Sequence, residues 1–213
     1  MARTSGTLPS GGMAAIRRVF RRNKIMSVLL VSFLVAMLYG SVLISQADES
    51  LKNKLVFLTQ EYLSIRGEQS VLSTFLTSIS TLSIYLVSGF LLGFFAFGQP
   101  CCIFIILFRG FGLGLSMGQI YLDYQAQGVI YCLVLIVPAA VLFTLILTAA
   151  LKDSIQLSNL FLAVLFPRFG NLAAQESLLK VYTIRYLVYF LLTFLIAALE
   201  SGMNFLFSGI IPL

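Results

Sequence analysis

The chain of 213 residues contains no histidine. This absence excludes histidine general bases, Ser-His-Asp triads and HExxH zinc sites. Charged residues are also scarce: they make up 10% of the chain, against about 25% in a typical soluble domain. Hydrophobic residues make up 59%. Because so apolar a chain has too few polar groups to cover a surface that faces water, the composition predicts an integral membrane protein.

Cysteine is rare as well, and Cys101, Cys102 and Cys132 all lie in apolar stretches without CxxC spacing. We therefore expect neither a zinc site nor a disulfide framework, and interpret these residues as small apolar side chains. The sequence shows no nucleophile beside a base and no pair of carboxylates placed for acid-base catalysis. We expect a protein that is not an enzyme and that uses no cofactor or metal.

Five apolar stretches are long enough to cross about 30 Å of hydrocarbon at 1.5 Å per residue. Residues 1–24 form a basic tail, and residues 25–213 are expected to form a single all-α domain, a polytopic bundle of transmembrane helices. The expected spans are 25–45, 71–97, 101–122, 129–151 and 184–210.

The basic residues before the first span predict the orientation. Because cytoplasmic segments carry an excess of Lys and Arg, the tail is expected inside and the C-terminus outside. The same charges indicate lipid headgroups rather than nucleic acid as the partner. Ser45-Gln46-Ala47 resembles a signal-peptide cleavage site, but an apolar run longer than 7–15 residues favours a retained span. The six basic residues are Arg3, Arg17, Arg18, Arg21, Arg22 and Lys24.

Glycines recur at intervals of four residues in the second and third spans. Such spacing lets helices approach closely in lipid, and the short connection Gly98-Gln99-Pro100 predicts that these two spans form a tight antiparallel hairpin. Gly112 adds a GxGxG run, but no strand precedes it, so we expect no nucleotide site there. The glycines assigned to helix packing are Gly89, Gly93, Gly110, Gly114 and Gly118.

Arg109 and Glu200 are the ionisable residues deep within the apolar spans. An Arg at the bilayer centre costs roughly 2.5–3.5 kcal/mol, so such a residue is expected to pair or to face water. We predict a buried ion pair between Arg109 and Glu200 that joins the third span to the fifth. A proton or ion relay is the alternative.

Two amphipathic segments flank the spans. The outer segment, 48–66, has one apolar stripe that is a candidate partner-binding surface, although it also suits the membrane surface or packing on its own bundle. The inner segment, 155–183, is interrupted by Pro167, and Asn171 is a plausible N-cap within it. It suits interfacial anchoring or docking of a cytoplasmic ATPase. The outer stripe consists of Leu51, Leu55, Leu58, Tyr62 and Ile65.

Several short motifs resemble the stage II sporulation protein M family. The run from Phe108 to Gly114, FRGFGLG, is followed by an outer turn that ends at Gly128 and by an apolar span containing Pro138. Residues 197–200, AALE, are one residue shorter than the family's small-small-x-x-Glu pattern. Residues 138–140, PAA, stand where some members of the wider family have His-Gly and Glu.

The resemblance implies a five-span protein of the bacterial cell membrane with no catalytic activity of its own. Such a protein is a scaffold that localises a peptidoglycan-hydrolase complex, a lytic transglycosylase with an amidase-endopeptidase, at the sporulation septum during engulfment. The implied partners are membrane lipids and wall hydrolases on the outer side. A small permease-like transporter subunit, docking an ATPase near Leu160, is the alternative, and a homo-oligomer assembled through the glycine faces is a third reading.

Overall fold

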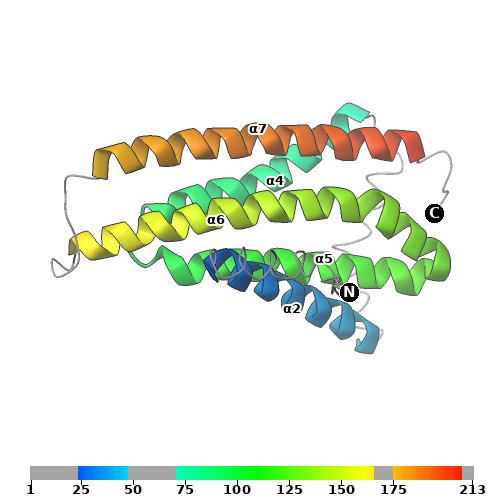
Figure 1. Ribbon diagram of the computed structural model, residues 1–213. Helices are drawn as coiled ribbons and strands as arrows, with labels where there is room; N and C mark the ends of the chain where they lie inside the picture. The colour runs from blue at the N-terminus through cyan, green and yellow to red at the C-terminus, as the bar shows by residue number, and fades with distance from the viewer. Residues whose placement is uncertain (1–23, 48–70, 166–174, 208–213) are drawn as a thin grey trace, which may run out of the picture.

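The computed structural model describes residues 24–47, 71–165 and 175–207, and these residues form a bundle of long helices with no strand among them (Figure 1). The predicted all-α class is confirmed. The helices are α2 (Lys24–Gln46), α4 (Val71–Gly93), α5 (Gly98–Tyr131), the π-helical turn η1 (Cys132–Ile136), α6 (Val137–Leu165) and α7 (Gln175–Phe207).

Within these ranges, four helical stretches are long and apolar enough to cross a membrane. The third stretch has 65 residues because it joins α5, η1 and α6, and it folds back on itself so that α5 and α6 lie side by side (Figure 1). The four stretches are Lys24–Gln46, Leu72–Gly93, Gly98–Leu162 and Leu179–Leu206.

The reversal between α5 and α6 is a distortion of the helical backbone. Gln125 has φ 49° and ψ −123°, a backbone conformation that residues other than glycine rarely adopt. Gly128 lies against the carbonyl oxygen of Ile120 so closely that a Cβ would collide with it. The predicted turn between Asp123 and Gly128 falls in this region.

A π-helical turn follows the reversal. The amide of Val137 donates to the carbonyl of Cys132, five residues back. The next residue is Pro138, which has no N–H to donate and whose ring disfavours regular α-helical bonding to the preceding turn. The helix accommodates Pro138 by forming a π turn directly before it.

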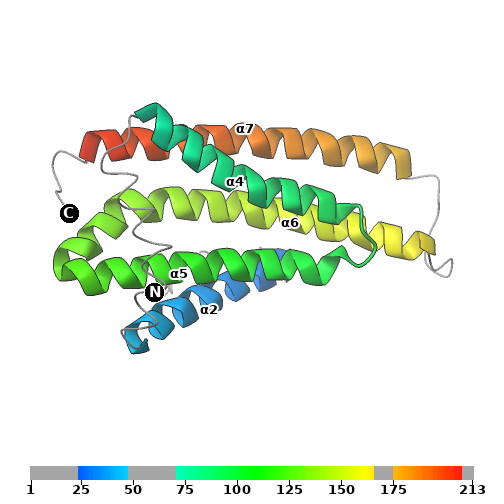
Figure 2. The ribbon, with the colours of Figure 1, turned by 180° about the vertical axis from the view of Figure 1, so that it is seen from behind.

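Helix direction alternates through the bundle. Viewed together, α2, α5 and α7 run toward the end where α5 bends into α6, and α4 and α6 run away from it (Figures 1 and 2). Helix α6 lies at the centre and contacts the other four helices. Its inward face is fully buried at Phe143, Leu147 and Leu151.

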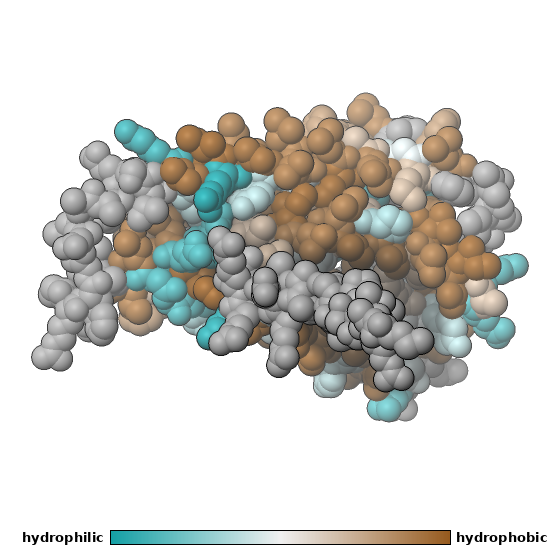
Figure 3. Space-filling view, viewed as in Figure 1, coloured by the Kyte–Doolittle hydropathy of each residue, from teal (hydrophilic) through white to brown (hydrophobic). Residues whose placement is uncertain are grey.

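The outer surface of the bundle is largely apolar. Figure 3 shows hydrophobic side chains across the middle of one face and hydrophilic ones gathered toward the two ends. Leu38, Ile84 and Leu187 are exposed to 67, 65 and 70%. An apolar band of this extent is typical of a surface that contacts lipid rather than water.

Candidate functional site

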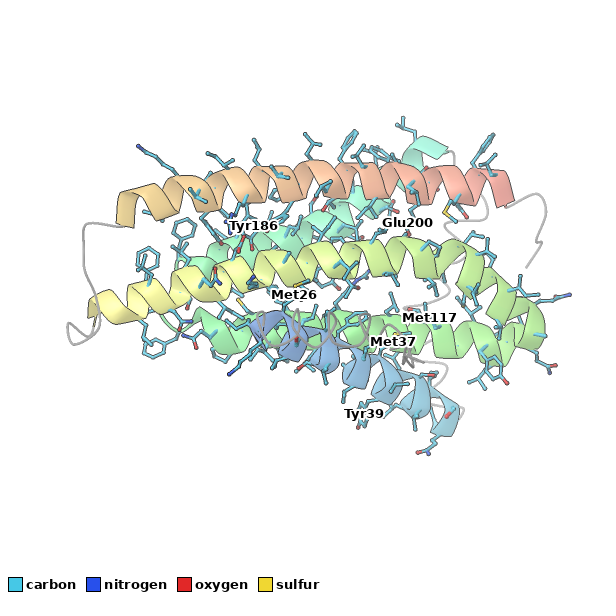
Figure 4. All side chains as sticks on the ribbon, viewed as in Figure 1. Met26, Met37, Tyr39, Met117, Tyr186 and Glu200 are labelled. Atoms are coloured by element: carbon cyan, nitrogen blue, oxygen red, sulfur yellow. The ribbon has the colours of Figure 1, made fainter. Side chains whose placement is uncertain are left out.

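A cavity of about 200 Å³ lies among α4, α5, α6 and α7. Its wall is mostly apolar, but it includes both of the ionisable residues that the sequence places deep within the spans. Figure 4 shows Glu200 extending from α7 toward α6, near the end of the bundle where α5 bends. The polar residues on the wall are Ser78, Thr81, Arg109, Ser116 and Glu200.

Two aromatic rings hold the guanidinium of Arg109. Its central carbon lies 5.4 Å from the ring centroid of Tyr85 and 5.5 Å from that of Phe143. At these distances the negative faces of the rings stabilise a cation. The Nε atom of Arg109 is buried and has no hydrogen-bond partner in the structure. The rings therefore satisfy the charge of Arg109, but they provide no acceptor for its innermost N–H.

The structure brings Arg109 and Glu200 to the wall of one cavity. The direct ion pair between the two side chains stays a prediction.

The hydroxyl groups on the wall present oxygen acceptors. Thr81 donates to the carbonyl of Thr77 at 2.9 Å, and Ser116 donates to that of Gly112 at 3.0 Å. Since each hydroxyl has one hydrogen, these bonds leave the oxygen lone pairs for other donors. A Cβ built on Gly112 would meet nothing within 4 Å, so this glycine leaves the cavity open beside Arg109.

The other glycines of α5 pack against α2. A Cβ on Gly110 would lie 2.5 Å from the carbonyl oxygen of Phe33, and one on Gly114 would collide with the backbone of Met37. Gly118 faces Ile44 in the same way. Because the contacts advance together along both helices, α2 and α5 pack in parallel.

The glycines of α4 face α6 and α7. Tyr186 and Leu151 lie against Gly89, and the Tyr182 hydroxyl lies against Gly93. The second and third spans do form an antiparallel hairpin, since α4 and α5 contact each other, but their glycines do not pack it: those of α4 face α6 and α7, and those of α5 face α2. A short connection brings two helices together end to end, but it does not determine which faces touch, and tyrosines of α7 occupy the space along α4.

A network of tyrosine and serine hydroxyls joins α4, α6 and α7. The Ser154 hydroxyl lies 2.6 Å from that of Tyr186. Tyr186 donates to the carbonyl of Ala150 at 3.2 Å, and Tyr182 donates to that of Phe90 at 2.9 Å. The sequence analysis missed this network, although the spacing of Tyr182, Tyr186 and Tyr189 along one helical face was a signal for it.

Asp153 is a second residue that the sequence analysis missed. Its buried carboxylate accepts a bond from Arg185 at 3.2 Å and one from the Tyr189 hydroxyl at 2.9 Å. Asp153 and Arg185 border a groove of about 270 Å³ that also includes Leu157 and Leu160. The stretches of α6 and α7 that border the groove lie toward the end of the bundle opposite the bend (Figure 1).

Other predicted features lie outside the described residues. They include the outer stripe, Leu51, Leu55, Leu58, Tyr62 and Ile65, the basic tail before Lys24, and Pro167 and Asn171 of the inner segment. Where the inner segment is described, α6 continues through it to Leu165 and α7 begins at Gln175.

The chain matches no protein-family model, no curated protein and no solved structure. The class of protein follows from its architecture. It is an all-helical bundle whose long apolar helices are compatible with a multi-pass membrane protein.

Proposed function

We propose that the chain crosses the bacterial cell membrane five times, with its N-terminus inside and its C-terminus outside. The alternating helix directions support this topology, because α5 and α6 then provide two of the five crossings (Figure 1). The basic residues before α2 support the orientation.

Cysteine labelling tests this topology. With the three native cysteines replaced by alanine, a single cysteine is introduced at Gln127, which is exposed near the bend, or at Gln99, the second residue of α5. We expect a membrane-impermeant maleimide to label Gln127→Cys in intact cells and Gln99→Cys only after the membrane is permeabilised. The reverse pattern would invert the orientation, and labelling of both from outside would contradict five crossings.

We propose that the protein is a non-enzymatic scaffold. The observation that carries this proposal is the glycine packing of α2 on α5, in which backbone lies against backbone at Gly40 and Gly110. Helix α4 is also packed closely in the bundle, because tyrosines of α7 lie against its glycines. The connection 48–70, which carries the outer stripe, therefore joins two helices that are both fixed to the bundle.

The proposed cargo is a peptidoglycan-hydrolase complex at the sporulation septum. The resemblance to stage II sporulation protein M supports this assignment, together with the positions of the helix ends that flank residues 48–70. Helix α2 ends and α4 begins at the same end of the bundle as the bend (Figure 2). In the proposed orientation this end faces outward, where wall hydrolases act.

Crosslinked affinity purification from sporulating cells tests the scaffold role. We expect wall hydrolases to be recovered with the full chain in mild detergent and to be lost with the double variant Leu55→Glu and Leu58→Glu, because two charges disrupt an apolar contact surface. The matched control is Asn53→Glu with Gln60→Glu, on the opposite side of the predicted helix, which is expected to retain the hydrolases. All variants must reach the membrane at equal abundance. Equal recovery with both variants would overturn the proposed surface.

A transporter subunit is the second candidate, and the groove bordered by Asp153, Leu160 and Arg185 favours it. In the proposed orientation this groove faces the cytoplasm. The same purification distinguishes the candidates. A cytoplasmic ATPase that is recovered without hydrolases, and is lost with Leu160→Glu, would replace the scaffold role with a transport role.

A further inference from the structure

We propose that the cavity among α4, α5, α6 and α7 binds a small zwitterionic group, in which an ammonium is joined through a short carbon chain to a phosphate or carboxylate. This proposal does not depend on the scaffold role. It rests on the cavity wall, which carries both a cationic hydrogen-bond donor, Arg109, and oxygen acceptors, among them Glu200.

Arg109 provides the anion-binding side. Its guanidinium is always charged and has five N–H donors arranged as a planar fork. The rings of Tyr85 and Phe143 compensate the charge, but aromatic rings do not accept hydrogen bonds as oxygen does. The buried Nε without a partner shows that the protein does not satisfy this cation completely. Arg109 also lines the cavity, where a phosphate or carboxylate oxygen would accept from the N–H groups that the guanidinium presents there.

The ammonium-binding side consists of oxygen atoms. Thr81 and Ser116 line the cavity and use their hydrogens on backbone carbonyls, so each hydroxyl oxygen keeps lone pairs for another donor. Glu200 adds a carboxylate to the same wall, and a carboxylate accepts from more than one donor at a time. An ammonium has three donors and no acceptor, which suits this wall.

The size of the cavity limits the ligand. Drug-sized molecules occupy pockets of about 300–1,000 Å³, and this cavity has about 200 Å³. An amino acid or a phosphoethanolamine group suits such a volume. Gly112 keeps this space open, because any side chain at that position would enter it.

Binding of defined probes to the purified full chain tests the proposal. In detergent, glycine and phosphoethanolamine are titrated separately, with ethanolamine alone and inorganic phosphate alone as single-charge controls. In nanodiscs, native mass spectrometry measures retention of phosphatidylethanolamine against phosphatidylglycerol. We expect at least one zwitterionic probe to bind at least about tenfold more tightly than either single-charge control, because only the zwitterion uses both walls. Binding of a free probe identifies a solute ligand, and retention of phosphatidylethanolamine alone identifies a lipid headgroup.

Two glycine variants provide the matched comparison. Gly112→Val places a side chain in the cavity, whereas Gly202→Val adds the same side chain in open space on α7, away from the cavity wall. Both positions have no atom within 4 Å of a built Cβ, so the new side chain begins in open space at both. We expect Gly112→Val to weaken binding at least about tenfold and Gly202→Val to leave it unchanged. The proposal is overturned if no zwitterionic probe binds the unmodified chain, if a single-charge control binds as tightly, or if both variants behave alike.

Discussion

Gly114→Leu is expected to destabilise the bundle by about 3 kcal/mol or more, at the upper end of the range for overpacked cores. The new side chain would begin inside the backbone of Met37, because even a Cβ at Gly114 collides with its carbonyl group. Backbone cannot rotate aside as a flexible side chain can, so α2 and α5 must separate. Unfolding of the purified protein in mixed micelles, followed by circular dichroism, measures the loss, and a disulfide between cysteines placed on α2 and α5 reports the separation.

Gly112→Ala is the control on the same helix. A Cβ there meets nothing within 4 Å, and alanine favours a helix by roughly 0.5–1 kcal/mol relative to glycine. We expect this variant, measured without added ligand, to match or exceed the stability of the unmodified chain. If the two substitutions destabilised the protein equally, the helix would be sensitive to any loss of glycine, and the parallel packing of α2 on α5 would not be the cause.

The helices themselves could be predicted from the sequence, because long apolar runs have few alternatives in a membrane. The function of each glycine could not be predicted in the same way. Gly110 and Gly114 face α2, whereas Gly112 faces the cavity from the same helix. A spacing of four residues identifies a face of a helix, but the partner of that face depends on how all the helices pack.

Some of the polar residues could also be predicted from the sequence, and others could not. The sequence places Arg109 and Glu200 within apolar spans, and the structure places both on one cavity. Asp153 lies two residues past the expected end of the fourth span, 129–151, and the sequence analysis gave it no role. Helix α6 instead continues past it, and Arg185 reaches it from α7. Because Arg185 is 32 residues away in the sequence, the residues around Asp153 do not indicate this ion pair.

Tyr186→Ala is expected to cost about 3 kcal/mol. Tyr186 is among the largest side chains that are fully buried, and it points from α7 into the bundle (Figure 4). Its removal leaves a cavity between α4, α6 and α7, and loss of a large aromatic side chain costs about 3–5 kcal/mol in soluble cores. We expect the lower end of that range, because lipid is as apolar as the core and transfer out of water contributes little to helix association. The lost van der Waals contacts remain as the cost.

The conservative variant Tyr186→Phe separates packing from hydrogen bonding. It keeps the ring and removes the hydroxyl that contacts Ser154 and the carbonyl of Ala150. A polar contact between membrane helices is worth about 0.6 kcal/mol on average, so this variant is expected to lose roughly 1 kcal/mol or less. Tyr121→Ala, on an exposed tyrosine of α5, controls for the loss of an aromatic side chain at the lipid surface. If Tyr186→Phe cost as much as Tyr186→Ala in the same unfolding measurement, the hydroxyl network rather than the packed ring would hold α7 to the bundle.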